Sequence, residues 1–117
     1  EAYYNRGTAY DYNGQYDQAI DDYSKAIAIN PQDAEAYNNR GIAYYNKNKY
    51  DQAIADYSKA IEINPRYADA YNNRGIAYEL KGQYDQAIAD YSKAIEINPR
   101  YADAYNNRGI NHDQNGQ

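Results

Sequence analysis

AEAYNNRGIAYYNKNKYDQAIADYSKAIEINPRY, residues 34–67, is the stretch that decides the fold. The stretch that follows, residues 68–101, repeats it with only five substitutions. Residues 1–33 are another copy that lacks its first position, and residues 102–117 match the first half of a fourth. A fixed period of this length is the signature of a repeat array, in which each unit packs against its neighbours. The sequence therefore predicts a single domain, residues 1–117, of three repeats followed by the first helix of a fourth or a capping helix.

The composition limits which partners and which cellular locations we expect for this chain. It has 117 residues, a formal net charge of −5, with 12 Lys and Arg against 17 Asp and Glu, and no cysteine. Nucleic-acid binding draws on clustered basic residues, so we expect no nucleic-acid partner. No apolar run is long enough for a membrane helix, and the lack of cysteine favours a cytoplasmic location. Because the chain begins with Glu1 and has no methionine, we expect it to be a piece of a longer protein.

Both halves of the unit show the spacing of a helix. In the first half, Tyr37, Gly41 and Tyr44 lie at i, i+4 and i+7, on one face of a 3.6-residue period. In the second half, Asp51 favours the positive N-terminal end of a helix, and Pro65 cannot continue one. No strand pattern appears in the sequence. Each unit is therefore predicted to form two helices joined by a turn.

The turn between these helices is predicted near Asn48. The matching copies have Gly14 and Gly82 at this place. A residue with left-handed backbone commonly ends a helix there, and glycine adopts that backbone without steric cost.

These positions resemble the tetratricopeptide repeat family, whose 34-residue pattern is W-x2-L-G-x2-Y, then A-x3-F, then P. The matching residues of the second unit are Tyr37, Arg40, Gly41, Tyr44, Ala53, Tyr57, Ala60 and Pro65. Tyrosine replaces the tryptophan and phenylalanine of the family, which adds a polar tip to each ring. The resemblance covers the whole chain and implies an all-α fold, a right-handed α-solenoid of antiparallel helix–turn–helix units that binds proteins or peptides.

Arginine stands in every unit where the family keeps leucine, and aspartate recurs with the same period on the second helix. The arginines are Arg6, Arg40, Arg74 and Arg108, and the aspartates are Asp22, Asp56 and Asp90. An unpaired buried charge is costly, so we expect each arginine to pair with one of these carboxylates, within a repeat or across repeats. The alternative is that the arginine heads reach solvent while their stems cover the core.

No pattern in the sequence supports catalysis, a cofactor or a metal. There is no cysteine nucleophile, no G-x-S-x-G and no phosphate-binding glycine loop, and His112 is the single histidine. Asn111 and His112 stand where the other units have Ala43 and Tyr44. They indicate either the start of a polar cap or divergence in a short terminal unit. We predict a protein that is not an enzyme.

In the family, six positions of each unit line a concave groove formed by the first helices. By resemblance, the candidate groove residues are Tyr4, Asn5, Thr8, Glu35, Asn38, Asn39, Ile42, Tyr45, Asp69, Asn72, Asn73, Ile76, Asn106 and Asn107. The same positions include Asp11, Tyr12, Asn46, Glu79, Leu80, Asp103 and Ile110. We call the row of asparagines, which runs from Asn5 to Asn107, the asparagine ladder.

Asparagine is a poor helix former, so its recurrence on the first helix needs a reason. A carboxamide offers both a donor and an acceptor, and can pair with a peptide backbone whatever the side chain. The asparagine ladder therefore predicts binding of an extended peptide, with the isoleucines Ile42 and Ile76 and the ring of Tyr45 contacting apolar side chains. The alternative is that these asparagines are copies of one successful unit, solvated and without a function.

The charges of the groove limit which peptides we expect it to bind. In the family, a clamp of lysine and arginine binds the C-terminal carboxylate of chaperone tails. Here only Asn39 matches that clamp, because Tyr4 and Asp69 replace its lysines and Asn73 replaces its arginine. Acidic groove residues, among them Glu1, favour a neutral or basic peptide instead.

A structural role is the competing prediction. Near-identical units with open ends can associate end to end, and contacts that do not close produce filaments. A spacer that positions other domains is a related possibility. The near identity of the units would also fit an engineered, consensus-like repeat protein.

Overall fold

The structure is a computed structural model that describes the backbone of residues 2–114 and the side chains of residues 2–110. These residues form helices and turns, with no strand among them. The helices are α1 (Ala2–Tyr12), α2 (Tyr16–Ile29), α3 (Ala34–Asn46), α4 (Tyr50–Ile63), α5 (Ala68–Leu80), α6 (Tyr84–Ile97) and α7 (Ala102–Gln114). The predicted charge of Glu1 in the groove and the predicted cap at Asn111 and His112 lie outside the described side chains.

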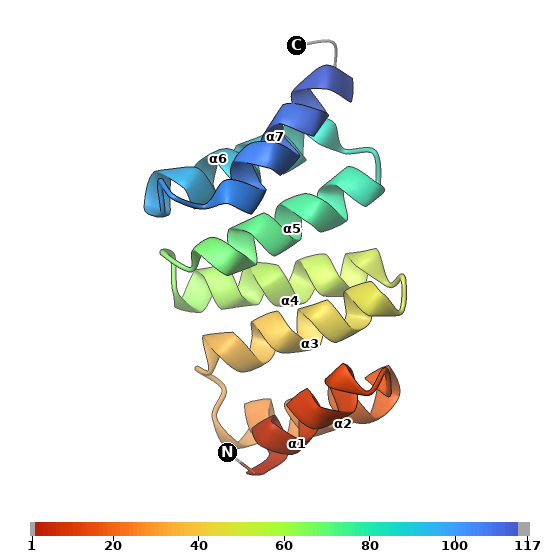
Figure 1. The fold of residues 1–117 in the computed structure, drawn as a ribbon. Coiled ribbons are helices and arrows are strands. Elements are labelled where there is room, and N and C mark those ends of the chain that lie inside the picture. Colours follow the sequence, from red (N-terminus) through yellow and green to blue (C-terminus); the bar gives the residue numbers. More distant parts are fainter. Residues whose placement is uncertain (1, 115–117) are drawn as a thin grey trace.

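The helices stack in chain order as antiparallel pairs, and the stack measures 45 × 25 × 20 Å (Figure 1). Each helix packs against the helix before it and the helix after it in the chain. The first helices of successive repeats, α1, α3, α5 and α7, also contact one another. One helix pair per period is thus observed, and the predicted all-α solenoid is confirmed.

The turn inside each repeat has the left-handed backbone that the sequence predicts. The φ angle is 76° at Gly14, 62° at Asn48 and 75° at Gly82. The residue that follows donates its N–H back to a carbonyl of the first helix, as Lys49 does to Tyr44 at 2.9 Å. This hydrogen bond closes the first helix and reverses the chain, so that the second helix packs back along it.

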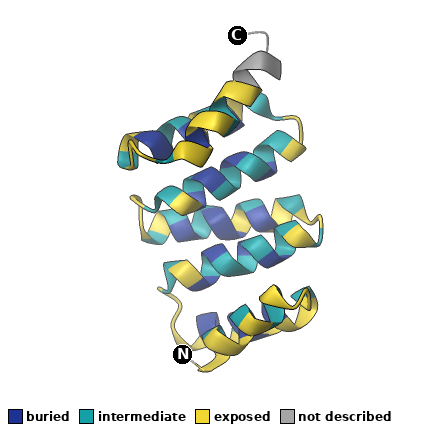
Figure 2. Cartoon of the chain, in the orientation of Figure 1, coloured by how far each residue is buried: buried dark blue, intermediate teal, exposed yellow. Residues whose placement is uncertain are grey.

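One tyrosine on each second helix forms the centre of the core. Tyr23, Tyr57 and Tyr91 are the largest fully buried aromatic side chains, and each is at most 1% exposed. The ring of Tyr57 lies against Gly41 of α3, where an added Cβ atom would stand 2.6 Å from it. Figure 2 shows the buried positions on the surfaces where neighbouring helices meet. Glycine is required at position 41 because the tyrosine ring occupies the space of a side chain.

The predicted arginine–aspartate pairs form within each repeat. Two nitrogens of Arg40 bond the carboxylate of Asp56, both at 2.8 Å. Arg74 bonds Asp90 in the same way, at 2.7 and 2.8 Å. The hydrogen bonds to Asp56 raise the pKa of Arg40 above its usual value. These arginine heads do not extend freely into solvent, because the two side chains are 21% and 20% exposed.

A further hydrogen bond from the same arginines joins neighbouring repeats. Arg40 Nη1 donates to Ser24 Oγ of the preceding repeat at 3.1 Å. Arg74 donates to Ser58 in the same way at 3.1 Å. A guanidinium carries five N–H donors in a fixed plane, so one arginine can hold a carboxylate and a hydroxyl together. The arginine that replaces leucine therefore connects helices both within a repeat and between repeats.

Candidate functional site

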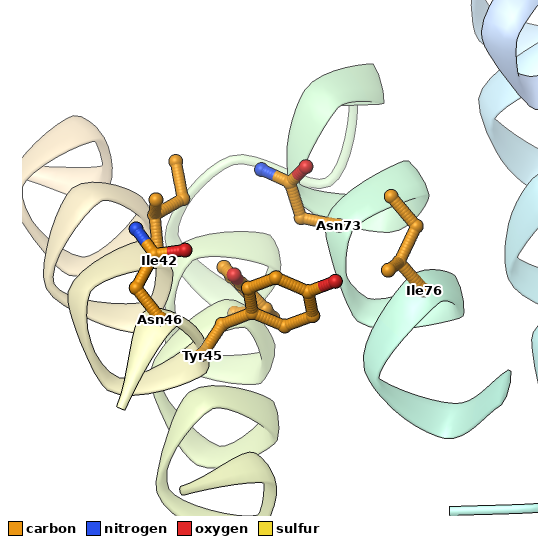
Figure 3. A pocket seen from close by; sticks show the side chains of 6 residues that line it. Ile42, Tyr45, Asn46, Asn73 and Ile76 are labelled. Atoms are coloured by element: carbon orange, nitrogen blue, oxygen red, sulfur yellow. The ribbon is translucent and has the colours of Figure 1, made fainter. Parts of the chain in front are cut away.

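The predicted groove residues of α3 and α5 enclose a pocket. Figure 3 shows the side chains of α3 facing those of α5 across it, and the lining is mainly apolar. Its volume is about 190 Å³, and its lining residues are Ile42, Tyr45, Asn46, Tyr57, Asn73 and Ile76. Residues of two adjacent repeats thus line one pocket of the groove.

A second pocket lies one repeat earlier, between α1 and α3, and its chemistry is different. Its volume is about 350 Å³, and its lining residues are Tyr4, Thr8, Asp11, Tyr12, Tyr23, Glu35, Asn39 and Ile42. Burial raises the pKa of Asp11, and its Oδ1 atom is buried without a hydrogen-bond partner among the described residues. Successive repeats therefore present a polar, acidic pocket and then a mainly apolar one.

The asparagine ladder divides into two kinds of residue. Asn38 and Asn72, which we predicted to line the groove, are buried, with exposed fractions of 4% and 5%. The carboxamide oxygen of Asn38 accepts a hydrogen bond from Asn73 Nδ2 of the next repeat at 3.1 Å. Asn72 accepts one from Asn107 at 3.4 Å. These two asparagines are buried because the next first helix covers them, and their amides connect neighbouring repeats.

Asn39 and Asn73 are the half-buried members of the ladder. Each is anchored through its nitrogen, since Asn39 Nδ2 donates to the hydroxyl of Tyr4 at 2.6 Å and Asn73 donates to Asn38. The Tyr4 hydroxyl in turn donates to Glu35 Oε1 at 2.6 Å. No described group donates to the carboxamide oxygen of either Asn39 or Asn73. The anchored amides thus keep an acceptor oxygen with both lone pairs available.

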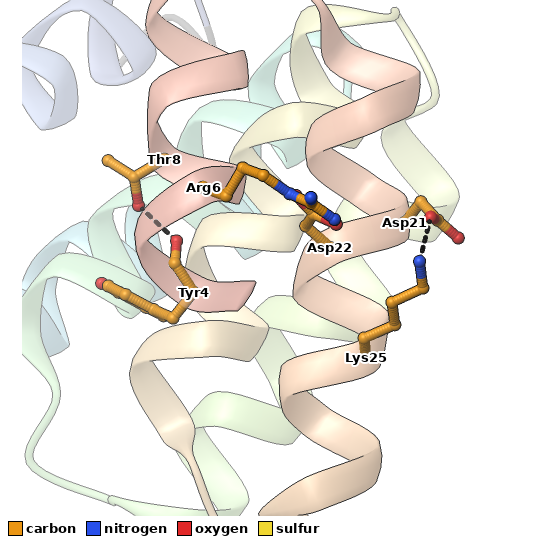
Figure 4. Close-up of polar contacts among 6 residues, drawn as sticks. All are labelled: Tyr4, Arg6, Thr8, Asp21, Asp22 and Lys25. Carbon is orange, nitrogen blue, oxygen red and sulfur yellow. Dashed lines mark hydrogen bonds and ion pairs between the residues drawn. The ribbon is translucent and has the colours of Figure 1, made fainter. Parts of the chain in front are cut away.

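The first helix carries the N-terminal end of this arrangement. Figure 4 shows Tyr4 and Thr8 one turn apart on α1, where the Thr8 hydroxyl donates to the Tyr4 carbonyl at 3.0 Å. Tyr4 takes the place that Asn38 has in the next repeat and accepts the same hydrogen bond. Asn5 and Asn106, near the two ends of the array, are exposed. They lack the covering neighbour that their equivalents have.

Carboxylates recur along the groove. Glu35, Asp69 and Asp103 are exposed, and Glu79 is half-buried. Asp69 accepts a hydrogen bond from the Tyr101 hydroxyl at 2.6 Å. Tyr4, Asp69 and Asn73 stand on this surface at the positions where the family's carboxylate clamp has lysine or arginine. The described part of the groove therefore carries a negative charge.

No group of three or more His, Cys, Asp and Glu side chains among the described residues could hold a metal ion. Among the same residues, no helix has both the length and the apolar character needed to cross a membrane.

Comparisons with known proteins identify the repeat. A family model described as tetratricopeptide repeat matches residues 1–33 and 68–101. Models described as TPR repeat and tetratricopeptide repeat match residues 43–82 and 23–55. The chain belongs to the tetratricopeptide repeat family. A comparison with curated protein sequences gives no match.

Solved tetratricopeptide structures superpose closely on this chain. The first TPR domain of Spaghetti (RPAP3), bound to the HSP90 peptide SRMEEVD, is 28% identical, with a TM-score of 0.96 over 99% of this chain and 92% of that one. The TPR domain of Arabidopsis OM64 is 28% identical, with a TM-score of 0.94 over 97% of this chain and 93% of that one. MamA is 32% identical, with a TM-score of 0.93 over 97% of this chain and 67% of that one.

One pocket residue of this tetratricopeptide array is absent from the predicted groove residues. Tyr57 occupies the A-x3-F position, which the family pattern assigns to stacking, but it also lines the pocket between α3 and α5. The available signal was the replacement of phenylalanine by tyrosine, which adds a hydroxyl to a buried ring.

Proposed function

We propose that this tetratricopeptide array is a non-catalytic scaffold that binds an extended, neutral-to-basic peptide along α1, α3 and α5. The observation that carries the proposal is the pair of anchored amides at Asn39 and Asn73. Each has its nitrogen bonded to the preceding repeat and its oxygen available. Peptide N–H groups need acceptors at regular intervals, and amides fixed one repeat apart supply them without further loss of side-chain entropy.

The charge of the groove supports a neutral or basic ligand. Glu35 and Asp69 are exposed along it, and an acidic peptide would be repelled by them. Related domains are solved with the HSP90 peptide SRMEEVD and the HSP70 peptide SGPTIEEVD, both rich in carboxylates. This chain has Tyr4 and Asn73 where a clamp for such tails would have cations, so we expect those two peptides to bind weakly.

Peptide selection with matched variants tests the proposal. The probe is a library of acetylated and amidated decapeptides, random except for two fixed lysines. We expect the unsubstituted chain to enrich a set of peptides, and the Asn39→Ala/Asn73→Ala variant to bind them about tenfold more weakly. Two hydrogen bonds of roughly 0.5–1.5 kcal/mol each are lost in that variant, and 1.4 kcal/mol corresponds to a factor of ten.

The control removes the same kind of connection between repeats but spares the acceptor oxygens. In the Asn72→Ala variant the hydrogen bond from Asn107 Nδ2 to Asn72 is lost, while Asn39 and Asn73 keep both their nitrogen partners and their oxygens. We expect this variant to lose stability but to keep the peptide preference. Equal capture by the Asn39→Ala/Asn73→Ala variant and the unsubstituted chain would contradict the proposal.

End-to-end self-association is the second candidate function, and one observation favours it. Gly41 and Gly75 each lie against a tyrosine of their own second helix, whereas a Cβ atom added at Gly109 of α7 would meet no atom within 4 Å outside its own helix backbone and chain neighbours. Tyr105 and Ile110 on the same helix are 45% and 43% exposed. The described face of α7 thus resembles a stacking surface without its neighbour. Sedimentation velocity over a hundredfold concentration range separates the two functions, because a strict monomer removes this candidate.

A further inference from the structure

Three equivalent tyrosines of the second helices have hydroxyls that point toward the groove. Tyr23, Tyr57 and Tyr91 are each at most 1% exposed, with the ring against the glycine of the first helix. A buried tyrosine hydroxyl normally has a hydrogen-bond partner. The three repeats therefore allow a direct comparison of how this hydroxyl is satisfied.

The two outer repeats supply a partner from their own first helix. Tyr23 donates to Thr8 Oγ1 at 3.2 Å, and Tyr91 donates to Glu79 Oε1 at 2.9 Å. The middle repeat has Ile42 at the position of Thr8, and Tyr45 at the position of Glu79. Tyr57 makes no hydrogen bond with any described residue, although its hydroxyl-bearing ring lines the pocket between α3 and α5.

That pocket has room for a ligand side chain. Its volume of about 190 Å³ is many times the roughly 10–15 Å³ that a cavity needs to hold one water. Ile42 and Ile76 provide apolar walls on the two sides, and Asn73 adds an amide with a free oxygen (Figure 3). A ligand side chain in this pocket would meet the Tyr57 hydroxyl, and one that offers no acceptor would leave a buried donor unsatisfied, which costs affinity.

The charges around the pocket disfavour an acidic occupant. Burial raises the pKa of Tyr57 and of Tyr45. The carboxylates of Asp56 and Asp11 raise the pKa of Tyr57 further, and that of Glu79 raises the pKa of Tyr45. A ligand carboxylate would meet the same negative field. The same field favours a neutral oxygen over a ligand carboxylate as the acceptor for the Tyr57 hydroxyl.

We propose that the pocket between α3 and α5 binds a glutamine side chain of the peptide. Its methylenes lie between Ile42 and Ile76, its carbonyl oxygen accepts from the Tyr57 hydroxyl, and its NH₂ donates to Asn73 Oδ1. A carboxamide complements the pocket at both ends, since it carries an acceptor and two donors. This inference rests on the proposed function, because the peptide must lie in the groove to place the side chain.

The unpartnered hydroxyl is tested first without any ligand. Tyr57→Phe removes a hydroxyl that has no protein partner, so the urea midpoint of unfolding stays the same or rises. Tyr23→Phe removes a hydroxyl bonded to Thr8, so the midpoint falls. Equal decreases in the two variants would overturn the inference, because Tyr57 would then have a partner within the chain.

The glutamine preference is then measured with the decapeptide library that has two fixed lysines. We expect the unsubstituted chain to enrich glutamine at one position, and Tyr57→Phe to reduce the preference for glutamine over leucine there about fivefold to tenfold. Ile42→Thr copies the first repeat and supplies the hydroxyl from within the chain, so the same reduction is expected. Tyr23→Phe is the matched control and leaves the preference unchanged.

The outcomes separate this inference from the proposed function. If the captured peptides depend on Asn39 and Asn73 but Tyr57→Phe selects the same residues at every position, the glutamine site is wrong and the scaffold function stands. If no peptide is enriched by the unsubstituted chain, both are wrong.

Discussion

The interfaces between repeats and the surface of the groove differ in how much they vary. Repeat 2 (residues 34–67) and repeat 3 (residues 68–101) are identical at the tyrosine, glycine, arginine and aspartate positions that stack. Their substitutions are Glu35 to Asp69, Tyr45 to Glu79, Asn46 to Leu80, Asn48 to Gly82 and Lys49 to Gln83. The first three pairs are groove positions, and the last two lie at the turn.

This contrast has a physical reason. A stacking residue contacts another copy of the same unit, so a substitution must suit the neighbours on both sides. A groove residue faces solvent or a ligand and has no such constraint. The groove position of Ile42 is accordingly Thr8 in the first repeat, whereas the buried tyrosine is the same in all three. Variation inside a nearly identical array therefore indicates the surface that meets other molecules.

Breaking the stacking network gives the largest expected effect. Asp56→Ala leaves the guanidinium of Arg40 without its carboxylate at a site where the arginine side chain is only 21% exposed. Removing one partner of a buried pair typically costs 3–5 kcal/mol, and partial exposure favours the low end. We expect the free energy of unfolding in urea to fall by about 3 kcal/mol.

Two further variants separate pairing from burial. Arg40→Leu/Asp56→Leu replaces the pair by apolar side chains and should recover most of the lost stability. Asp22→Ala breaks the equivalent pair at the N-terminal repeat, where Arg6 is 55% exposed, and should lower the free energy of unfolding much less than Asp56→Ala does. Equal losses for Asp22→Ala and Asp56→Ala would show that burial of the pair is not what sets its contribution.

A smaller effect is expected at the glycines that receive the tyrosine rings. Gly41→Ala places a Cβ atom 2.6 Å from the Tyr57 ring, and overpacking of this kind costs about 1–3 kcal/mol. The better helix propensity of alanine offsets up to about 1 kcal/mol, so we expect a net loss of about 1–2 kcal/mol. The measurement is the urea midpoint of unfolding. The slope of the unfolding free energy against urea concentration, the m-value, should stay constant.

Gly109→Ala is the matched control for that variant. Gly109 has no atom within 4 Å of an added Cβ, so only the propensity term applies. We expect stability to be unchanged or to rise by up to about 1 kcal/mol. A loss at Gly109 comparable to that at Gly41 would mean that glycine is needed in these helices for a reason other than the tyrosine ring.

Most of the fold could be predicted from the sequence because the period makes each inference repeat itself. The spacing of Arg40 and Asp56 recurs in every full repeat, so a charge pair was expected before any contact was known. The left-handed residue at Asn48 was likewise indicated by glycine in the other copies. The sequence left open whether each arginine pairs within its repeat or across repeats, since both choices have the same period.

It was harder to predict from the sequence which asparagines of the groove are buried. Asn38 and Asn39 are neighbours in sequence and chemically identical, and a carboxamide suits a buried contact as well as a ligand. Only the position of the next first helix shows that it covers Asn38 and leaves Asn39 half-buried. The lack of a hydrogen-bond partner for Tyr57 was harder still to predict, because it depends on Ile42 and Tyr45, neither of which supplies an acceptor to its hydroxyl.

The turn offers the smallest expected effect and separates the two kinds of variation between the interior repeats. Asn48→Gly makes the turn of repeat 2 like that of repeat 3, at a φ of 62° that glycine adopts freely. It loses only an exposed hydrogen bond from the Tyr50 hydroxyl, so the free energy of unfolding should change by less than about 0.5 kcal/mol. Asn48→Ala should cost about 1 kcal/mol, because alanine is strained in that backbone.

Peptide selection should be unchanged in both variants, whereas Tyr45→Glu, the corresponding exchange in the groove, should alter it by giving Tyr57 the carboxylate partner that Tyr91 has. If Asn48→Gly altered selection as much as Tyr45→Glu, variation between repeats would no longer distinguish the binding surface from the turn.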